Sequence, residues 1–237
     1  MNSNDIAEKV TAIITAAGKG TRMNSSINKQ YLEIAGVPVL ARTISAFENC
    51  CEVDNIILVV NEDDINFCKH EIVEKFNFTK VISLVSGGAE RQNSVYKGLC
   101  SIRDKNGIVL IHDGARPFVT NENIVDCINT AKKFGACGIG VRSKDTIKIS
   151  DENGFVKSTP DRSSLWSIQT PQGFIYDIIK DAHDKAVQNG YIGTDDMVLV
   201  EKLGIQVKIV EGSYQNIKIT TPEDLIIGES IISRQAK

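Results

Sequence analysis

The sequence lacks any long apolar stretch. None of its apolar runs approaches the roughly 20 residues that a membrane-spanning helix needs, so a helical span is excluded. The first segment, Met1–Lys9, is polar and no apolar stretch of the secretory type follows it. We therefore expect the protein in the cytoplasm.

An excess of positive charge is also missing. The 237 residues include 27 Lys and Arg against 30 Asp and Glu, which gives a formal net charge of −3. Nucleic acids and anionic membranes normally bind a basic face, so neither is expected as a partner. A small-molecule substrate fits the composition better.

Paired cysteines of the CxxC type are absent as well. The six cysteines are scattered, and three of them fall in segments with helical patterning. Reduced structural thiols are therefore favoured over zinc ligands or disulfides. These cysteines are Cys50, Cys51, Cys68, Cys100, Cys127 and Cys137.

Short apolar runs alternate with segments of helical spacing along the first 141 residues. This alternation predicts a Rossmann-like α/β fold, with a mainly parallel sheet, helices on both faces and sites at the carboxyl ends of the strands. We expect one domain, residues 1–237. The predicted strands are Thr11–Ala16, Ile56–Val60, Val81–Val85, Ile108–Ile111, Gly138–Val141 and, later, Val207–Val210. The predicted helices include 63–76, 92–102, 121–134, 175–188, one from Thr194 and one from Pro222.

The alternation breaks over residues 142–170, which we call the arm. Residues 145–149 alternate with period two, a turn cluster follows at 151–154, and an extended pattern resumes, so a projecting β-hairpin is predicted. Its apolar side chains exceed what an isolated hairpin can bury, which favours contact with a second copy of the chain. A hairpin folded back on its own domain is the alternative.

A glycine-rich segment, residues 16–23 with the sequence AAGKGTRM, follows the first predicted strand. Gly18 and Gly20 would let backbone N–H groups approach phosphate oxygens, and Arg22 would add a forked cation. The segment matches neither GxGxxG nor GxxxxGK[ST]. Taken alone, it is equally compatible with a tight turn that leaves Lys19 and Arg22 in solvent.

Several further motifs accompany this segment and carry a family resemblance. KQYL begins at Lys29, GVPVL at Gly36, GGAERQNSV at Gly87 and HDGARP at His112. Together they resemble the 2-C-methyl-D-erythritol 4-phosphate cytidylyltransferases of the non-mevalonate isoprenoid pathway and the related ribitol-5-phosphate cytidylyltransferases. The later motifs look like the methylerythritol enzymes, and the likeness extends from Ala12 to Leu225. These motifs are KDTIK (144–148), TPDR (159–162), QTPQ (169–172), TDD (194–196) and NIKITTPEDL (216–225).

The resemblance implies CMP transfer from CTP to a polyol phosphate, with release of pyrophosphate. Such a reaction needs fixed cations around the phosphates. Arg22 and Lys29 are implied to hold the triphosphate, and Lys218 to reach the α-phosphate. Lys218 also stands between Ile217 and Ile219, which would put it on the opposite face from two apolar neighbours, although it could be a solvated strand residue.

The remaining implied roles concern the nucleotide, the metal and the acceptor. Backbone groups of Gly88 and the side chain of Ser94 would read the pyrimidine, and Ala89 stands where relatives often have an acidic residue. Asp113 would help to hold Mg²⁺ or substrate hydroxyls, whereas His112 is expected to pack and not to act as a base. The residues implied to contact CTP are Ala16, Ala17, Gly18, Gly20, Gly88, Ser94, Asp113 and Gly114.

The acceptor would be bound by Arg116, Asp113, Thr146 and Arg162, with the last also implied in catalysis. Thr146 and Arg162 are implied to come from the arm of a neighbouring subunit, which makes a homodimer functional. CTP is then the co-substrate and Mg²⁺ the cofactor. The other readings are ribitol 5-phosphate as acceptor and, from another class, a non-catalytic nucleotide-sensing domain.

Overall fold

The computed structural model describes residues 8–18 and 31–235. Its centre is a seven-stranded sheet with the spatial order β11-β7-β10-β6-β1-β4-β5. β10 runs antiparallel to β6 and β7, and the other neighbouring strands pair in parallel. The strands are β1 (Lys9–Thr15), β4 (Asn55–Val60), β5 (Val81–Ser86), β6 (Gly107–Asp113), β7 (Ala136–Arg142), β10 (Trp166–Ile175) and β11 (Lys208–Glu211).

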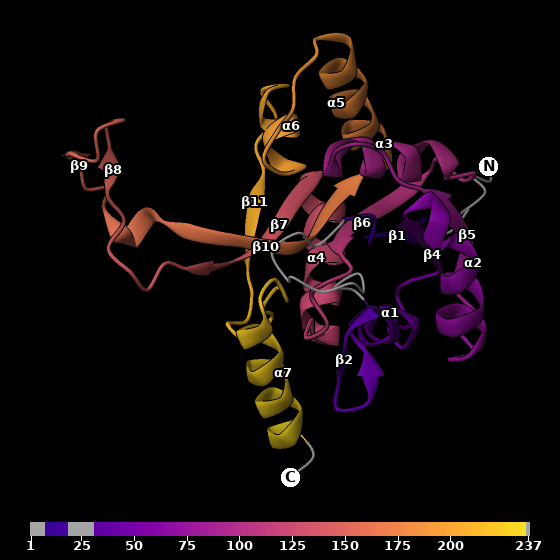
Figure 1. The fold of residues 1–237 in the computed structure, drawn as a ribbon. Coiled ribbons are helices and arrows are strands. Elements are labelled where there is room, and N and C mark those ends of the chain that lie inside the picture. The colour runs from indigo at the N-terminus through magenta and orange to yellow at the C-terminus, as the bar shows by residue number, and fades with distance from the viewer. Residues whose placement is uncertain (1–7, 19–30, 236–237) are drawn as a thin grey trace.

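Helices cover both faces of this sheet (Figure 1). One face packs against α1 (Val39–Glu48), η4 (Cys68–Glu74) and α4 (Asn121–Phe134). The opposite face packs against α3 (Arg91–Ser101), α5 (Tyr176–Gln188) and α6 (Met197–Glu201). The predicted α/β fold is therefore confirmed.

The apolar runs of the sequence are strands buried on both faces. In β1, Ala12 and Ile14 pack in one apolar cluster and Ile13 packs in the other, and none of the three is exposed. Side chains alternate across a sheet, so a strand with helices on both sides must be apolar at every position. This explains why the parallel strands appear in the sequence as unbroken apolar runs.

Two elements differ from the predicted ones. Residues 166–175 were not predicted as a strand, yet they form β10, the longest strand of the sheet. The segment 63–76 was predicted as one helix, but it divides into η3 (Glu62–Asp64), α2 (Ile65–Phe67) and η4, a π-helical turn. In η4 the N–H of Lys75 donates to the carbonyl of His70, five residues back.

The carboxyl ends of the parallel strands meet at one edge of the sheet. There the N–H of Gly114, just after β6, donates to the carbonyl of Thr15 at 2.8 Å. The N–H of Gly87, just after β5, donates to the carbonyl of Val60 at 2.7 Å. These bonds hold the loop after β6 against the end of β1 and the loop after β5 against the end of β4.

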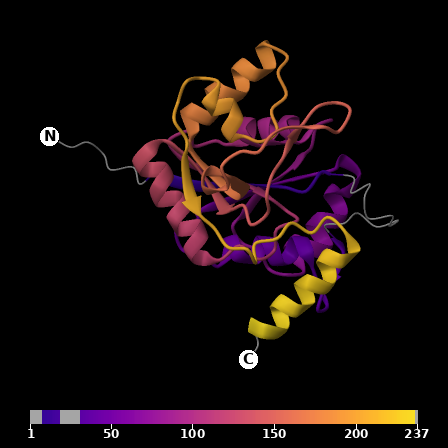
Figure 2. The same cartoon turned by 90° about the vertical axis from the view of Figure 1, so that its left-hand side faces the viewer.

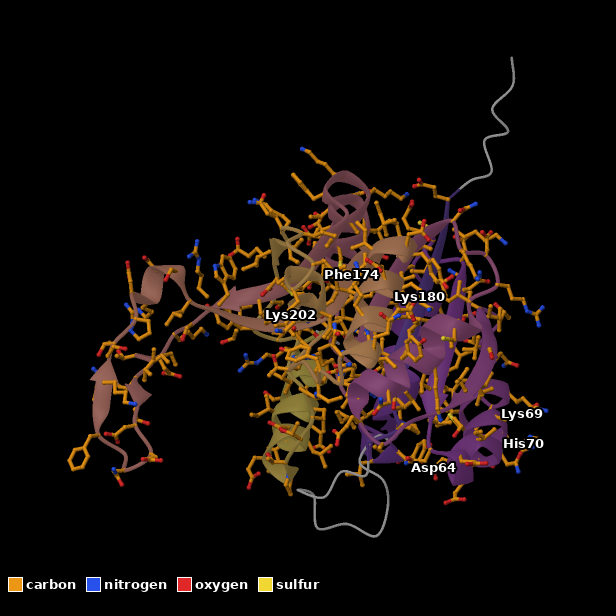
Figure 3. The ribbon with its side chains drawn as sticks, turned by 90° about the horizontal axis from the view of Figure 1, so that it is seen from above. Asp64, Lys69, His70, Phe174, Lys180 and Lys202 are labelled. Atoms are coloured by element: carbon orange, nitrogen blue, oxygen red, sulfur yellow. The ribbon has the colours of Figure 1, made fainter. Side chains whose placement is uncertain are left out.

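The arm leaves the body beyond β7 and returns through β10 (Figure 1). It contains the short antiparallel strands β8 (Ile149–Ser150) and β9 (Val156–Ser158) and the turn η5 (Arg162–Ser164). Seen from above, the arm stands apart from the body, with Lys69 and His70 on the far side and Phe174 between them (Figure 3). The predicted projecting β-hairpin is confirmed.

The last helix, α7 (Pro222–Gln235), begins where the sequence predicts. Its apolar side chains pack with Ile34 of β2 (Glu33–Ile34) and with Val39, which follows β3 (Val37–Pro38). Viewed from the side of the arm, α7 lies at the opposite end of the molecule from α5 and α6 (Figure 2). Within residues 8–18 and 31–235, no helix has the length and apolar character needed to cross a membrane.

Candidate functional site

A pocket of about 660 Å³, counting the part open to solvent, lies at the carboxyl edge of the sheet. Three loops and one distant segment meet there, as expected for an α/β fold. Thr15 ends β1 and Ala16 to Gly18 follow it, residues 88–94 lead from the loop after β5 into α3, Asp113 ends β6, and Lys218 belongs to the segment before α7. The described lining residues are Thr15, Ala16, Ala17, Gly18, Gly88, Ala89, Glu90, Arg91, Ser94, Asp113, Ala115 and Lys218.

Asp113 is the centre of the charged contacts. Its Oδ1 accepts a hydrogen bond from Nε of Arg91 at 2.9 Å, and its Oδ2 lies 2.6 Å from Nζ of Lys218. Nε of Arg116 is farther away, at 3.9 Å from Oδ2. Burial by itself would raise the pKa of Asp113, but Arg91 and Lys218 hold that pKa well below its usual range. Asp113 is therefore ionised whenever the protein is folded near neutral pH.

Lys218 reaches the pocket because its neighbours anchor the segment around it. Ile219 is fully buried, and its N–H donates to the carbonyl of Ala115 at 2.8 Å. Ile217 packs against the same apolar cluster as Ile219. The segment is not part of a sheet, so these contacts and not strand pairing fix its position. The two isoleucines face the cluster, and Lys218 faces Asp113.

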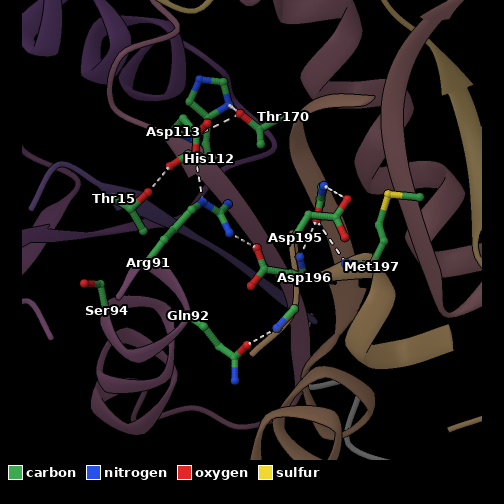
Figure 4. Close-up of polar contacts among 12 residues, drawn as sticks. Thr15, Arg91, Gln92, Ser94, His112, Asp113, Thr170, Asp195, Asp196 and Met197 are labelled. Atoms are coloured by element: carbon green, nitrogen blue, oxygen red, sulfur yellow. Dashed lines mark hydrogen bonds and ion pairs between the residues drawn. The ribbon is translucent and has the colours of Figure 1, made fainter. Parts of the chain in front are cut away.

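Arg91 is a residue of the pocket to which sequence analysis gave no role. Its guanidinium lies between two carboxylates, with Nε bonded to Asp113 and NH1 bonded to Oδ2 of Asp196 at 2.6 Å (Figure 4). Asp196 is 1% exposed, and its Oδ1 lies 3.1 Å from Nε2 of the buried His183. Burial alone would raise the pKa of Asp196, but Arg91 and His183 lower that pKa by more than burial raises it, so the net shift is downward. Both residues stand in family motifs, at 87–95 and 194–196, but the spacing of these motifs in the sequence does not indicate that Arg91 and Asp196 are in contact.

The charges of the described residues around the pocket balance. Arg91, Arg116 and Lys218 bring three positive charges, and Asp113, Asp196 and the lining residue Glu90 bring three negative ones. The described residues therefore give the pocket no net charge of their own.

His112 lies behind the pocket wall and is fully buried. Its Nε2 donates to the carbonyl of Arg116 at 3.1 Å, and its Nδ1 accepts from the hydroxyl of Thr170 at 3.1 Å. The Oγ1 of Thr170 in turn accepts the N–H of Asp113 (Figure 4). Burial lowers the pKa of His112 to about 4, so the ring is neutral near pH 7. It supports Asp113 through Thr170.

The loop after β5 forms a second wall of the pocket. The N–H of Gly88 donates to Oγ of Ser94 at 3.0 Å, and Glu90 and Asn93 cap the start of α3 reciprocally. A Cβ added at Gly87 would lie only 2.4 Å from the Cβ of Ala17. Glycine at 87 is therefore required for the close approach of this loop to the one after β1.

The structure brings some of the expected site residues together and separates others. Ala16, Ala17, Gly18, Gly88, Ser94, Asp113 and Lys218 line one pocket, and Gly114 adjoins it. Gly20, Arg22 and Lys29 lie outside the described residues. Arg116 lies beside the pocket, partly buried, and its NH1 donates to the carbonyl of Asn216 at 2.8 Å.

Thr146 and Arg162 belong to the arm, which projects from the body (Figure 1). Arg162 lies with Arg142, Ser143, Asp161 and Ser163 in an open hollow at the base of the arm. Neither residue is among the described residues that line the pocket of Asp113.

A divalent metal would find one suitable carboxylate here. Within residues 8–18 and 31–235, no three His, Cys, Asp or Glu side chains form a metal-binding group. Asp113 offers hard oxygen atoms at the pocket, and Mg²⁺ commonly takes one or two carboxylates together with phosphates and water. The donor set fits a magnesium ion that is held mainly by a bound triphosphate.

Comparisons with known proteins agree over nearly the whole chain. The model of the IspD family, described as 2-C-methyl-D-erythritol 4-phosphate cytidylyltransferase, matches residues 10–234. A protein of that name from Caldanaerobacter subterraneus is 50% identical over 225 residues, which cover 95% of this chain and 99% of the relative. Another from Clostridium kluyveri is 52% identical over 220 residues, 93% of this chain and 95% of the relative.

Solved structures give the same result. The crystal structure of 4-diphosphocytidyl-2C-methyl-D-erythritol synthase from Anaerococcus prevotii aligns with a TM-score of 0.86 and 37% identity, covering 99% of this chain and all of that one. The 2-C-methyl-D-erythritol 4-phosphate cytidylyltransferase from Thermus thermophilus aligns with a TM-score of 0.77 and 28% identity, covering 95% of this chain and 99% of that one.

Proposed function

The chain belongs to the 2-C-methyl-D-erythritol 4-phosphate cytidylyltransferase family, and from this premise we propose that the pocket at Asp113 is its catalytic site. The protein is a cytidylyltransferase that uses CTP in isoprenoid precursor biosynthesis. It transfers CMP to 2-C-methyl-D-erythritol 4-phosphate, which gives 4-diphosphocytidyl-2-C-methyl-D-erythritol and pyrophosphate. The observation that carries the assignment of the site is the convergence of Arg91 and Lys218 on Asp113 at the edge of the sheet.

The chemistry requires cations and no general base. An oxygen of the acceptor phosphate attacks the α-phosphorus of CTP, and pyrophosphate leaves in line. A phosphate oxygen is already deprotonated near pH 7, so the protein has only to position the reactants and to stabilise the charge that develops. Lys218 serves this purpose as the cation that reaches the α-phosphate. His112, neutral and bonded on both ring nitrogens, is not needed for proton transfer.

The nucleotide occupies the space between the loops after β1 and β5. Backbone groups at Gly88 and the hydroxyl of Ser94 read the edge of the cytosine, and Ala16 to Gly18 form the opposite wall. Gly20, Arg22 and Lys29, which lie outside the described residues, are proposed to bind the triphosphate. The support from the described residues is that Gly18, the last of them before this segment, already lines the pocket.

The acceptor is held by residues of two subunits. Arg116 lies beside the pocket of its own chain, and Thr146 and Arg162 are contributed by the arm of a second copy. The exposed apolar side chains of the arm support the homodimer, because Phe155 is 73% exposed and Val156 is 60% exposed. An isolated two-stranded hairpin with such side chains is not stable in water by itself.

Asp113 and the phosphates of CTP would hold Mg²⁺. When bound, the metal neutralises phosphate charge and favours departure of pyrophosphate. Lys218 shares Oδ2 of Asp113, so this carboxylate orients the lysine as well as offering a ligand.

One assay separates this function from its competitors. The protein is supplied with CTP, Mg²⁺ and either 2-C-methyl-D-erythritol 4-phosphate or ribitol 5-phosphate, and pyrophosphate release is measured. Turnover with the methylerythritol phosphate is expected. Turnover with ribitol 5-phosphate alone would make ribitol 5-phosphate the acceptor, and CTP binding without pyrophosphate from either acceptor would indicate a nucleotide sensor.

A further inference from the structure

Arg91 carries a contact that the proposed chemistry leaves unexplained. One edge of its guanidinium faces Asp113 in the pocket, and the other faces Asp196 in the interior (Figure 4). Asp196 is 1% exposed and is not among the lining residues of the pocket. Among the described residues, the carboxylate of Asp196 is therefore linked to the pocket by its bond to Arg91.

Both oxygens of Asp196 are used. Oδ2 accepts from NH1 of Arg91 at 2.6 Å, and Oδ1 accepts from Nε2 of His183 at 3.1 Å. His183 on α5 is fully buried, and its ring stacks on Tyr96 of α3 with centroids 6.2 Å apart. The carboxylate is thus bonded from two helices.

The backbone at Asp196 is fixed as well. The side chain of Gln172 on β10 is buried, and its Oε1 accepts the N–H groups of Asp196 at 3.1 Å and of Met197 at 3.2 Å. Gln172 and His183 together leave the carboxylate of Asp196 one orientation. A group held this rigidly can serve as a reference for a more flexible neighbour.

We propose that Asp196, held by His183 and Gln172, is a positioning residue that fixes the plane of Arg91 and thereby sets the geometry of Asp113 and Lys218. An arginine side chain has several rotatable bonds, and two bonds from different nitrogens of its planar fork define both its place and its plane. With Asp113 alone, the guanidinium could turn toward a bound triphosphate. Asp196 also balances the positive charge of Arg91.

This inference rests on the proposed function and is tested with the same assay. Asp196→Asn should lower kcat by about 10-fold to 100-fold, the range expected when a reacting group shifts by a fraction of an ångström or more. KM for CTP should stay the same or fall, because the guanidinium of Arg91 loses its bond to a charged Asp196 and adds positive charge to the pocket that binds CTP. A partly unfolded sample would also lower the apparent kcat at an unchanged KM, so kcat is calculated per folded protein, with the folded fraction taken from urea unfolding.

Asp195→Asn is the matched control. Asp195 is the adjacent carboxylate and bonds Gln172 and the N–H of Val198, but not Arg91. Asparagine can still cap the start of α6, so kcat should stay within about twofold of wild type. Equal losses in Asp195→Asn and Asp196→Asn would overturn the proposal.

A double-mutant cycle with Arg91→Lys tests the route of the effect. If Asp196 acts through Arg91, then adding Asp196→Asn to Arg91→Lys should change kcat by no more than about twofold. If the loss of kcat in the double variant equals the product of the two single losses, Asp196 acts independently of Arg91, and the proposal is overturned.

Breaking a buried ion pair can unfold a protein, so a second pair of variants keeps the test decisive. His183→Gln retains an N–H near the place of Nε2, and His183→Leu removes it while Arg91 still pairs with Asp196. The leucine variant should lose kcat and the glutamine variant should recover it, with neither difference seen in the Arg91→Lys background. Equal kcat for the two variants would count against the proposal, whereas an inactive wild-type protein would refute the proposed function and not this inference alone.

Discussion

Nζ of Lys218 lies 2.6 Å from Oδ2 of Asp113, so the lysine of the pocket already has a carboxylate partner before any phosphate arrives. An ordered partner keeps a long side chain in one place and reduces the entropy lost when the substrate binds. The contact also places the charge of Lys218 where phosphate oxygens would meet it. The first prediction concerns this residue.

Lys218→Ala should lower kcat by about 10²–10³, because a donor to the charge that develops on the α-phosphate is removed. Pyrophosphate release at saturating CTP and acceptor measures the effect. Lys208→Ala, on the exposed strand β11, is the control and should stay within about twofold of wild type. Normal turnover in the Lys218 variant would remove this lysine from the mechanism.

The pH dependence of stability should report on His112. Its pKa is lowered to about 4 in the folded protein, while the unfolded chain has the ordinary value near 6.5. Between these values the unfolded state binds more protons, so the free energy of unfolding should fall as pH decreases from about 6.5 to about 4 and should be level above that range. The loss is on the order of 3 kcal/mol for this one group.

Urea unfolding at a series of pH values measures this slope, and His112→Gln should flatten it. Asp113 and Asp196 have lowered pKa values, so their contributions are present above the unfolded pKa near 3.9 and are lost only as pH falls below it. They do not act in the same window. An unchanged slope in the glutamine variant would contradict the assignment to His112.

The placement of Arg162 in the partner's site can be tested with mixed dimers. Arg162→Ala and Lys218→Ala should each be nearly inactive alone. After the two are exchanged in equal amounts, half of the dimers are mixed, and each mixed dimer has one site with both native residues. About a quarter of the wild-type activity should then return.

If Arg162 served the site of its own chain, every site in the mixture would lack one residue and no activity would return. Sedimentation of each variant confirms that dimers are present.

Phe155→Asp, which puts a charge on the exposed apolar surface of the arm, should shift the protein toward monomer and lower activity with it.

Gly87→Ala should weaken nucleotide binding selectively. A Cβ at this position would lie 2.4 Å from the Cβ of Ala17 and 3.1 Å from Oγ of Ser94, so the two walls of the nucleotide pocket must move apart. KM for CTP should rise about tenfold or more, and KM for the acceptor should change little. A rise in both constants, with a lower melting temperature, would indicate a general disturbance of the fold.

The parallel half of the fold could be predicted from the sequence because its strands are buried on both faces. Residues such as Ile13, Ile57 and Leu58 leave an unbroken apolar signal. β10 leaves none, since its centre reads Gln169-Thr170-Pro171-Gln172-Gly173. These polar side chains are buried and bonded to other parts of the chain, which a local pattern does not reveal. The register of β10 also shifts between Ile168 and Gln172, which interrupts its alternation.

The site was partly predictable for a related reason. Loops at the carboxyl ends of parallel strands must meet, so Gly18, Ser94 and Asp113 could be placed together from the order of the strands and the family motifs. Arg91 and Asp196 were present in those motifs, but the ion pair between them depends on how α3 packs against the start of α6. Such a contact is fixed by the tertiary structure and has no signature in residue spacing.

A single strand connects the arm with the carboxylate at the centre of the pocket. β10 begins at Trp166 within the arm, and four residues later, where the arm ends, Thr170 bonds both the N–H of Asp113 and the ring of His112. Deleting one residue from this short stretch would turn the threonine hydroxyl toward the other side of the sheet. The length of the chain between Trp166 and Thr170 is therefore constrained twice, because the direction in which the arm projects and the alignment of Asp113 depend on the same few peptide units.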